Sequence, residues 1–260
     1  MSTLAPIGTV RCAQRYRYEA PRQGVWGGGN EAIVELHDDP ALRQGLTGLA
    51  GFARLWVVYL FHHNSGWRPF VQPPRADVGR VGVFATRSPH RPNPLGLSCV
   101  ELVGIDGGCV HIRNHDLLDG TPVLDLKPYV PYADAFPDAA AGWLDGVTET
   151  PRELVWTPAA AARATWVATH AGLDMRHFAQ VQLRHEPTAA DRKRIAPDPE
   201  RPDGWVIAYR TWRLHYTLAP GLVTIHDVRS GYSAADLDDP ADRHHDKASH
   251  RAFLAVFPPD

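Results

Sequence analysis

Residues 97–112 read LSCVELVGIDGGCVHI and carry the clearest fold signal in the chain. Two runs rich in β-branched and aliphatic residues flank Asp106-Gly107-Gly108, a tight-turn sequence that predicts a β-hairpin. Further strand-like runs occur at residues 32–36, 55–61, 81–86 and 123–127. Because no long helical pattern alternates with these runs, a parallel βαβ sheet is disfavoured. The first half of the chain is therefore predicted to form an antiparallel barrel or sandwich.

The second half of the chain follows a different pattern. Residues 136–151 are rich in Ala, Gly, Pro and Asp, which is typical of a linker. Helices are expected from Pro158 to about His170, over residues 175–185, and after a capping-box pattern at residues 188–191. Residues 205–218 and 222–228 flank a Pro-Gly turn and are expected to pair as a hairpin. We therefore expect a β domain over residues 1–145 and a smaller α+β domain over residues 146–260.

Composition excludes several protein classes. Of the 260 residues, 44% are hydrophobic and 22% are charged, as in ordinary soluble globular proteins. No run reaches the ~18 uncharged apolar residues of a membrane helix, and the N-terminus does not resemble a signal peptide. Cys12, Cys99 and Cys109 are an odd number without CxxC spacing, which argues against a disulfide scaffold or a thiolate zinc site. These features predict a cytoplasmic protein with no membrane association.

The fourteen histidines do not form a recognisable metal-binding pattern. His62 and His63 are adjacent at a predicted strand end, so their side chains are expected to point to opposite faces. His111 and His115, four apart on an apparent strand, would lie about 13 Å from each other. Neither pair suits chelation of one ion, so no metal site is expected.

Charge is distributed unevenly although the net charge is only −2. From Arg68 to Arg91 there are five arginines and one aspartate, a local charge of +4. Within this segment, residues 82–96 read GVFATRSPHRPNPLG, a loop whose three prolines restrict its course. Arginines held in such a loop suit an anionic or planar polar ligand, because guanidinium binds carboxylate or phosphate bidentately. The alternative is a solvated turn in which the prolines merely end strands.

A second polar cluster, residues 114–122, reads NHDLLDGTP. Its carboxylates and carbonyls can accept hydrogen bonds from ribose hydroxyls or from an amine. Ordinary Asx-turn chemistry explains the same residues equally well.

Both clusters closely resemble the TrmO (TsaA-like) family. The resemblance extends to three further segments, Pro21-Arg22-Gln23, Phe61-His62-His63 and Asp125-Leu126-Lys127-Pro128-Tyr129. The resemblance covers roughly the first 140 residues and implies a mainly β fold, in which a small antiparallel barrel binds S-adenosyl-L-methionine and an α+β domain follows. It implies a homodimeric methyltransferase. The implied reaction is N6-methylation of N6-threonylcarbamoyladenosine beside the anticodon, with the tRNA anticodon stem-loop as partner.

Carried over by position, the resemblance assigns cofactor binding to Pro21, Arg22, Gln23, His62, His63, Arg87, Leu97, Asp116, Leu117, Leu118, Asp119 and Gly120. His63 departs from the family, which commonly has glutamine there. Candidates for holding the substrate or accepting its proton are Arg91, Asn93, Asp125, Lys127 and Tyr129. RNA is expected to follow the arginine-rich segment, with Trp67, Tyr129 or Trp212 as stacking residues.

The second half resembles the family far less. Residues 198–202, DPERP, look like the family's Asp-Pro-Arg-Pro segment with one residue inserted, and residues 211–216 depart from the usual pattern. These departures affect the substrate more than the cofactor, because this domain is the possible RNA-binding one. Two alternatives therefore stay open: a methyltransferase of the same barrel acting on a small molecule or another RNA, and a non-catalytic S-adenosylmethionine-binding regulator.

Overall fold

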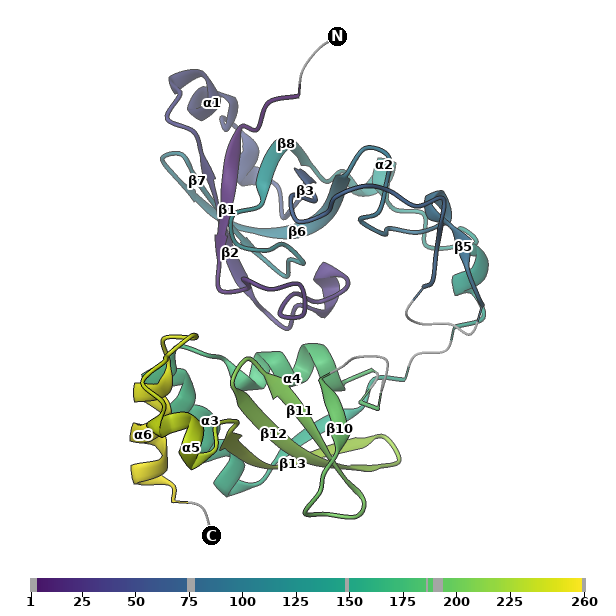
Figure 1. Cartoon of the computed structure of the whole chain (residues 1–260). Coiled ribbons are helices and arrows are strands. Elements are labelled where there is room, and N and C mark those ends of the chain that lie inside the picture. The colour runs from purple at the N-terminus through teal and green to yellow at the C-terminus, as the bar shows by residue number, and fades with distance from the viewer. Residues whose placement is uncertain (1–3, 74–77, 148–149, 186, 189–193, 259–260) are drawn as a thin grey trace. The chain divides into compact units, whose positions relative to one another are not determined.

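The chain divides into two compact units, Met1–Thr148 (unit 1) and Glu149–Asp260 (unit 2). The computed structural model describes residues 4–73, 78–147, 150–185, 187–188 and 194–258 (Figure 1). Within these ranges, none of the helices has the length and apolar character needed to cross a bilayer.

Unit 1 is a closed barrel of six antiparallel strands, which confirms the predicted mainly β fold. The strands are β1 (Gly8–Cys12), β2 (Glu31–Leu36), β3 (Arg54–Leu60), β6 (Leu95–Asp106), β7 (Cys109–Arg113) and β8 (Pro122–Pro128). Their order around the barrel is β1-β2-β7-β6-β3-β8, and β1 closes it by pairing with β8. Alternate residues point inward, so Val34, Val57, Val100 and Ile112 form a core from which water is excluded.

The predicted hairpin is confirmed, because β6 pairs with β7 and Asp106 lies opposite Cys109. Gly107 has a φ of +58°, which explains the glycine in this turn. Strand β1 was not among the predicted strands.

The prediction of a strand over residues 81–86 is wrong for most of its length. Strand β5 is only Val81–Gly82 and pairs with β4 (Phe70–Val71), after which the chain forms the 3-10 turn η3 (Val83–Ala85). The turn forms because the Val83 carbonyl accepts hydrogen bonds from the backbone N–H and the hydroxyl of Thr86. Local hydrogen bonds here replace the ladder that the apolar pattern suggested.

Short elements complete unit 1. They are η1 (Gly24–Trp26), α1 (Pro40–Gly45), η2 (Leu49–Gly51), α2 (Pro131–Asp134) and η4 (Gly142–Leu144). Part of the expected linker packs within unit 1, because the indole of Trp143 donates to the carbonyl of Ala85 at 2.9 Å and residues up to 147 belong to that unit.

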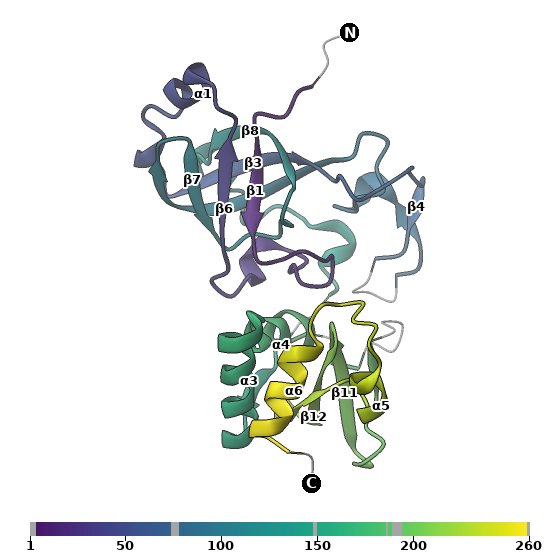
Figure 2. The ribbon, with the colours of Figure 1, turned by 60° about the vertical axis from the view of Figure 1, so that its left-hand side comes forward.

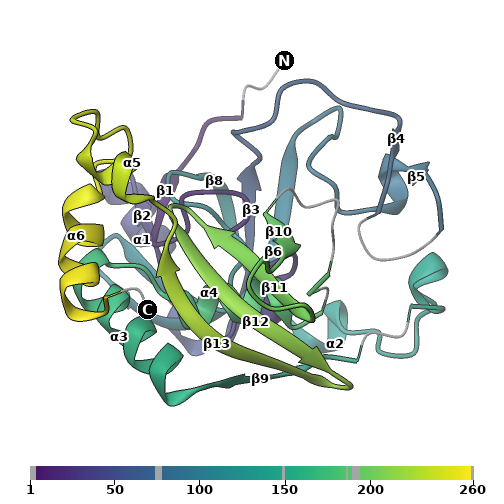
Figure 3. The ribbon, with the colours of Figure 1, turned by 60° about the horizontal axis from the view of Figure 1, so that its bottom comes forward.

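Unit 2 is a five-stranded sheet with helices packed against it, so the expected α+β character is confirmed. The sheet order is β10 (Ile195–Pro197), β11 (Gly204–Tyr209), β12 (Trp212–Ala219), β13 (Leu222–Ser230) and β9 (Glu153–Trp156). Among the described strands of unit 2, only β9 and β13 pair in parallel. Figure 3 shows the long β12 and β13 strands at the centre of this sheet.

The helices of unit 2 are α3 (Pro158–Ala171), α4 (Met175–Leu183), α5 (Ala234–Asp238) and α6 (Lys247–Val256). Figure 2 shows α3 and α6 side by side, and Trp166 of α3 meets Phe253 of α6 edge to face. Helices α3 and α4 confirm two predictions, whereas α5 and α6 were not expected. Most of residues 188–191 lies outside the described part of the chain.

The segment expected as one strand over residues 205–218 is two strands. Arg210 adopts a φ of +52° and turns the chain between β11 and β12. Neither glycine, proline nor an Asn-Gly pair marks this turn, so the sequence carried no signal for it. The following Pro220-Gly221 hairpin between β12 and β13 is confirmed.

Candidate functional site

The strand order collects three loops at one end of the barrel. Strands β1, β3 and β7 end where β2, β6 and β8 begin, because neighbouring strands are antiparallel. The connecting loops are residues 13–30, 61–94 and 114–121. They contain every expected cofactor-binding residue except Leu97, which lies on β6 near the same end. We call this end of unit 1 the loop end.

The loop of residues 13–30 contacts both of the other loops through hydrogen bonds and close backbone packing. The guanidinium of Arg87 donates to the amide oxygen of Gln23 at 2.9 Å. Gly24 approaches the carbonyl of Asn114 so closely that a Cβ on it would lie 2.5 Å from that oxygen. Asn30 and His115 exchange two further bonds, at 2.9 and 3.1 Å. The loops that carry Gln23, Arg87 and Asp116 are therefore fixed relative to one another.

Asp116 is the best-defined carboxylate of the loop end. It accepts a hydrogen bond from the hydroxyl of Ser98, whose oxygen in turn lies 3.4 Å from that of Tyr59. Burial raises the pKa of Asp116, because removal from water disfavours the charged form. Arg87 opposes this effect by its positive charge. Burial also raises the pKa of Tyr59, so the phenol stays protonated and can donate.

Ser98 and Tyr59 were not predicted from the sequence. Both face the barrel interior, and the Tyr59 ring lies over Gly96 on the paired strand, where a Cβ would sit 2.2 Å from the ring. A hydroxyl at an inward-facing strand position was the one available signal, because such groups usually have a polar partner when buried.

His62 and His63 lie together, so the prediction that they point to opposite faces is wrong. Their ring centroids are 3.9 Å apart, because β3 ends at Leu60 and the two residues form a turn after it. Burial and the charges of His63 and Arg17 lower the pKa of His62. Arg17 also donates to the carbonyl of His63, which links this turn to the loop of residues 13–30.

The remaining loop-end candidates have identifiable structural contacts. Leu117 is fully buried in the barrel core. Asp119 accepts from the backbone N–H of Cys12 at 3.1 Å, and Gly120 has a φ of +77° that favours glycine. The Leu118 carbonyl accepts from Thr121. Pro21 is buried, whereas Arg22 is half-buried.

Leu97 is 53% exposed on the outer face of the barrel. Val58 pairs with Leu97 on one side and with Asp125 on the other, so these three side chains share a row on the outer face. Asp125 forms an ion pair with Lys127 at 2.8 Å. Leu97 and these two substrate-contact candidates therefore occupy one sheet surface, with about 10 Å between the backbones of β6 and β8.

The other substrate-contact candidates lie elsewhere. Tyr129 packs against Trp56, with ring centroids 5.8 Å apart. Asn93 is exposed, and its carbonyl accepts from Leu95. Arg91 donates to the carbonyls of Val83 and Thr86, at 3.3 and 2.6 Å. The guanidinium of Arg91 therefore holds the loop of residues 83–91 together.

The expectation that Trp212 stacks on RNA is wrong. Trp212 is buried in the core of unit 2, where it stacks on His250 with centroids 3.9 Å apart. Trp67, by contrast, is 52% exposed. Arg75, one of the five arginines of the basic segment, lies outside the described residues.

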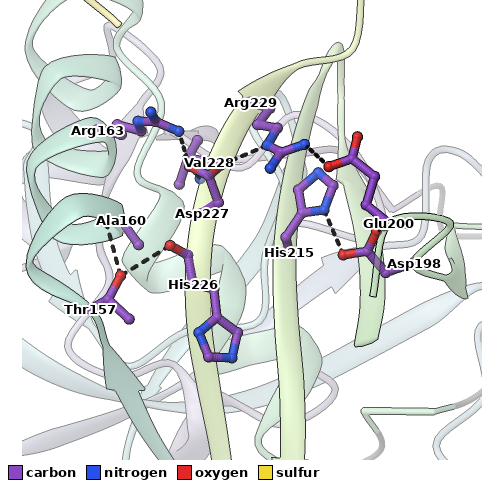
Figure 4. Close-up of polar contacts among 10 residues, drawn as sticks. All are labelled: Thr157, Ala160, Arg163, Asp198, Glu200, His215, His226, Asp227, Val228 and Arg229. Carbon is purple, nitrogen blue, oxygen red and sulfur yellow. Dashed lines mark hydrogen bonds and ion pairs between the residues drawn. The ribbon is translucent and has the colours of Figure 1, made fainter. Parts of the chain in front are cut away.

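Unit 2 carries a second cluster of charged residues, drawn in Figure 4. Asp227 accepts from Arg163, from the Arg229 Nε at 2.6 Å and from the backbone N–H of Val228 at 2.8 Å. Arg229 also pairs with Glu200. The ring of His215 lies 2.9 Å from the carboxylate of Asp198, whose pKa is lowered by this contact although burial alone would raise it. These charges are satisfied by one another.

In the part of the chain that the structure describes, no group of three or more His, Cys, Asp or Glu side chains is arranged to hold a metal ion. Cys12, Cys99 and Cys109 are all free.

Comparison with known proteins places the chain in a family. Residues 9–135 match the family model described as the tRNA-methyltransferase O N-terminal domain. The Pseudomonas aeruginosa protein named "Putative S-adenosylmethionine-dependent methyltransferase RcsF" is 34% identical over 239 residues, which cover 88% of this chain and 98% of RcsF. The Escherichia coli tRNA (adenine(37)-N6)-methyltransferase is 42% identical over 146 residues, but these cover only 53% of this chain and 61% of the enzyme.

The fold comparison agrees with the sequence comparison. The crystal structure of TrmO from Pseudomonas aeruginosa superposes with a TM-score of 0.64 at 30% identity, over 88% of this chain and all of that one. The match therefore includes both units, and the family model and the relatives point to the same family. The chain belongs to the TrmO family of tRNA methyltransferases.

Proposed function

We propose that this chain transfers a methyl group from S-adenosylmethionine to N6 of adenosine 37 in tRNA, with N6-threonylcarbamoyladenosine as the acceptor. The observation that carries the proposal is the loop end of the barrel, where Arg87, Gln23 and Asp116 are held together. The names of the relatives, including the Escherichia coli enzyme, support the tRNA substrate.

The residues of the loop end suit the cofactor chemically. Arg87 can donate to a carboxylate, and Asp116 and Asp119 can accept from ribose hydroxyls or an ammonium group. A cation near Asp116 would favour its ionised form and oppose the effect of burial on its pKa. Leu97 offers exposed apolar surface for an uncharged part of the ligand. We infer that these residues hold S-adenosylmethionine.

S-adenosylmethionine supplies a methyl group on a sulfonium that is its own leaving group. The protein therefore contributes mainly by aligning the acceptor with the donor and excluding water, which is worth up to ~7–11 kcal/mol. The nitrogen that accepts the methyl group must lose its proton. Among the five substrate-contact candidates, Asp125 is the only carboxylate, and its oxygen lies 2.8 Å from the ammonium of Lys127. We assign proton acceptance to Asp125.

The two units are proposed to have different roles. We propose that unit 1 binds the cofactor and the target base, and that unit 2 contacts the tRNA through exposed groups such as Arg201. The protein is further proposed to be a cytoplasmic homodimer, as the family resemblance implies. Sedimentation velocity of the purified chain tests the dimer.

The decisive experiment incubates the full chain with methyl-labelled S-adenosylmethionine and tRNA that carries N6-threonylcarbamoyladenosine, followed by mass spectrometry of the nucleosides. Label on N6 of that nucleoside is the expected result. Equal label in tRNA without the threonylcarbamoyl group would contradict the proposed acceptor. Cofactor binding without label in any RNA would favour the regulator alternative.

A further inference from the structure

Phe84 is exposed to an unusual degree for a side chain on a fixed loop. It lies in the middle of η3 and is 75% exposed, whereas its neighbour Val83 is 1% exposed and anchors the turn. A large apolar side chain in water gains nothing for folding, because it buries little surface. The structure nevertheless uses several contacts to hold this turn in place.

Four residues supply the contacts that hold this turn. The carbonyl of Val83 accepts from the N–H and hydroxyl of Thr86 and from the guanidinium of Arg91. The backbone N–H of Val83 donates to the carbonyl of Pro69 at 2.9 Å, across the β4–β5 pair. On the other side of Phe84, the carbonyl of Ala85 accepts from the indole of Trp143. The backbone on both sides of Phe84 is therefore fixed, and the aromatic ring is presented by a rigid support.

Arg91 also lies over the ring itself. Its guanidinium carbon is 5.8 Å from the ring centroid of Phe84, at the distance of a cation–π contact. A cation against one part of an aromatic ring leaves the rest available to a planar partner. The same loop carries Arg87, three residues further along, in the candidate cofactor site.

The surroundings of Phe84 are positively charged. Arg68 and Arg80 are exposed, and neither forms an ion pair with any residue that the structure describes. The backbone of Arg68 is bonded to His90 of the Phe84 loop, and Arg80 donates to the carbonyl of Phe70, which pairs with Gly82. An exposed ring among unpaired arginines is the arrangement that binds single-stranded nucleic acid, with bases stacked on the aromatic and phosphates near the cations.

From these contacts we infer that Phe84 is a stacking platform for an unpaired base of the RNA substrate, next to the site of methyl transfer. This inference rests on the proposed function and adds a substrate-positioning residue to it. Anticodon loops are unpaired, so their bases are free to stack on protein aromatics. The platform acts by orientation: it holds the loop so that the target nitrogen meets the methyl donor.

The test compares Phe84→Ala, Phe84→Leu and Phe84→Trp in the full chain. We expect the alanine and leucine variants to raise the KM for tRNA and the Kd for an anticodon stem-loop by about tenfold, because one base–aromatic stack is lost. The tryptophan variant should keep wild-type values. Its additional fluorescence, measured as the difference from wild type, should be quenched by the stem-loop.

Tyr132→Ala is the matched control. Tyr132 is 90% exposed, but α2 follows the end of β8, at the opposite end of the barrel from the loop end. Its removal takes away a larger exposed aromatic and should leave the KM for tRNA unchanged. Raising the salt concentration separates stacking from charge: the fold loss in Phe84→Ala should persist, since stacking is scarcely screened.

Three results would overturn the inference. The first is a wild-type KM for tRNA in both Phe84→Ala and Phe84→Leu. The second is a weakened Kd for S-adenosylmethionine in these variants, which would assign Phe84 to the cofactor. The third is a change of oligomeric state in sedimentation, which would assign Phe84 to a contact between copies. If instead the wild-type chain fails to methylate tRNA, the proposed function itself fails, whatever the variants do.

Discussion

Arg87 at the loop end of the barrel and Asp227 in unit 2 show how differently two charged residues can be placed in one chain. Arg87 bonds one described side chain, the neutral amide of Gln23. Asp227 accepts from two arginines and from a backbone N–H. A charge already compensated by its neighbours has little left to offer a ligand, whereas a half-satisfied one gains from binding. We therefore expect changes at the loop end to affect function and changes at Asp227 to affect stability.

Substitution of Arg87 should have the largest effect. Arg87→Ala removes a charge-assisted donor worth ~1.5–3 kcal/mol, so the Kd for S-adenosylmethionine should rise by about a hundredfold. The melting temperature should stay within about 2 °C of wild type, because the side chain is not part of the barrel core. Isothermal titration calorimetry and thermal unfolding measure the two quantities.

The control for this prediction is Arg43→Ala. Arg43 pairs with Asp38 beside α1, at the end of the barrel away from the candidate site. The Arg43→Ala variant should bind S-adenosylmethionine with the wild-type Kd. If Arg87→Ala also kept its affinity, the candidate site would have to move away from this loop.

Substitution of Asp227 should lower the stability of the protein and leave its affinity for S-adenosylmethionine unchanged. Asp227→Ala leaves Arg163 and Arg229 without their shared carboxylate, at side-chain exposures of 22% and 38%. Because the cluster is only partly buried, the expected loss of unfolding free energy is about 2–3 kcal/mol, between the values for surface and buried pairs. Chemical denaturation measures it.

At a temperature where the variant is folded, Asp227→Ala should bind S-adenosylmethionine with the wild-type Kd. Glu200→Gln is the matched control, since its carboxylate lies at the exposed end of the same chain of ion pairs and should cost little. A stable Asp227→Ala protein with weakened cofactor binding would reverse our assignment of the two clusters.

The fold could be predicted further than the site. Strand alternation and the Asp106-Gly107-Gly108 turn are local signals that predicted an antiparallel barrel or sandwich, and the family resemblance selected the barrel. The turn at Arg210 was missed because an arginine in the left-handed conformation cannot be recognised from the residue types around it. The strand expected over residues 81–86 failed because apolar residues also suit a short 3-10 turn when its carbonyls find donors.

The candidate site depends on contacts that local patterns do not contain. The bond between Ser98 and Asp116 joins β6 to a loop 18 residues later. The fit of Tyr59 over Gly96 requires the β3–β6 register. Only the family resemblance gathered Pro21, His62 and Arg87 into one site, and the strand order explains how they come to the same end of the barrel.

Acid should weaken unit 2 through His250. This buried ring contacts the hydroxyls of Thr211 and Ser230 at 2.9 and 2.8 Å, and burial lowers its pKa to about 4. Arg213 lowers the pKa further, whereas Asp246 and Asp242 oppose the shift. The unfolded chain takes up this proton below about pH 6.5 and the folded one only below about pH 4, so stability falls as the pH drops between these values.

We expect His250 to account for about 2 kcal/mol of stability lost between pH 7 and pH 4.5. Denaturation curves at several pH values measure the slope. His250→Gln should flatten that slope, even though the variant is less stable at pH 7. His244→Gln, at an exposed position a few residues earlier, should leave it as in wild type. An unchanged slope in His250→Gln would place the titrating group elsewhere.

The smallest predicted effect concerns the basic segment beside Phe84. Arg68 is exposed and has no acidic partner among the described residues, so it is available for a phosphate. Each phosphate contact to single-stranded nucleic acid contributes about −0.7 to the slope of log K against log salt. Arg68→Gln should therefore make the slope for anticodon stem-loop binding shallower by about 0.7, with cofactor affinity unchanged.

Arg11→Gln provides the comparison for this slope. Arg11 is also an exposed arginine of unit 1, but Glu35 neutralises it on the outer face of the barrel. Its loss should leave the slope unchanged, because a compensated charge displaces no counterion from RNA. The net charge of −2 does not oppose the effect of Arg68, since at 0.15 M salt the screening length is only ~8 Å and distant acids contribute little. Equal slopes for wild type and Arg68→Gln would move the RNA away from this surface, and with it the reason for a base to reach Phe84.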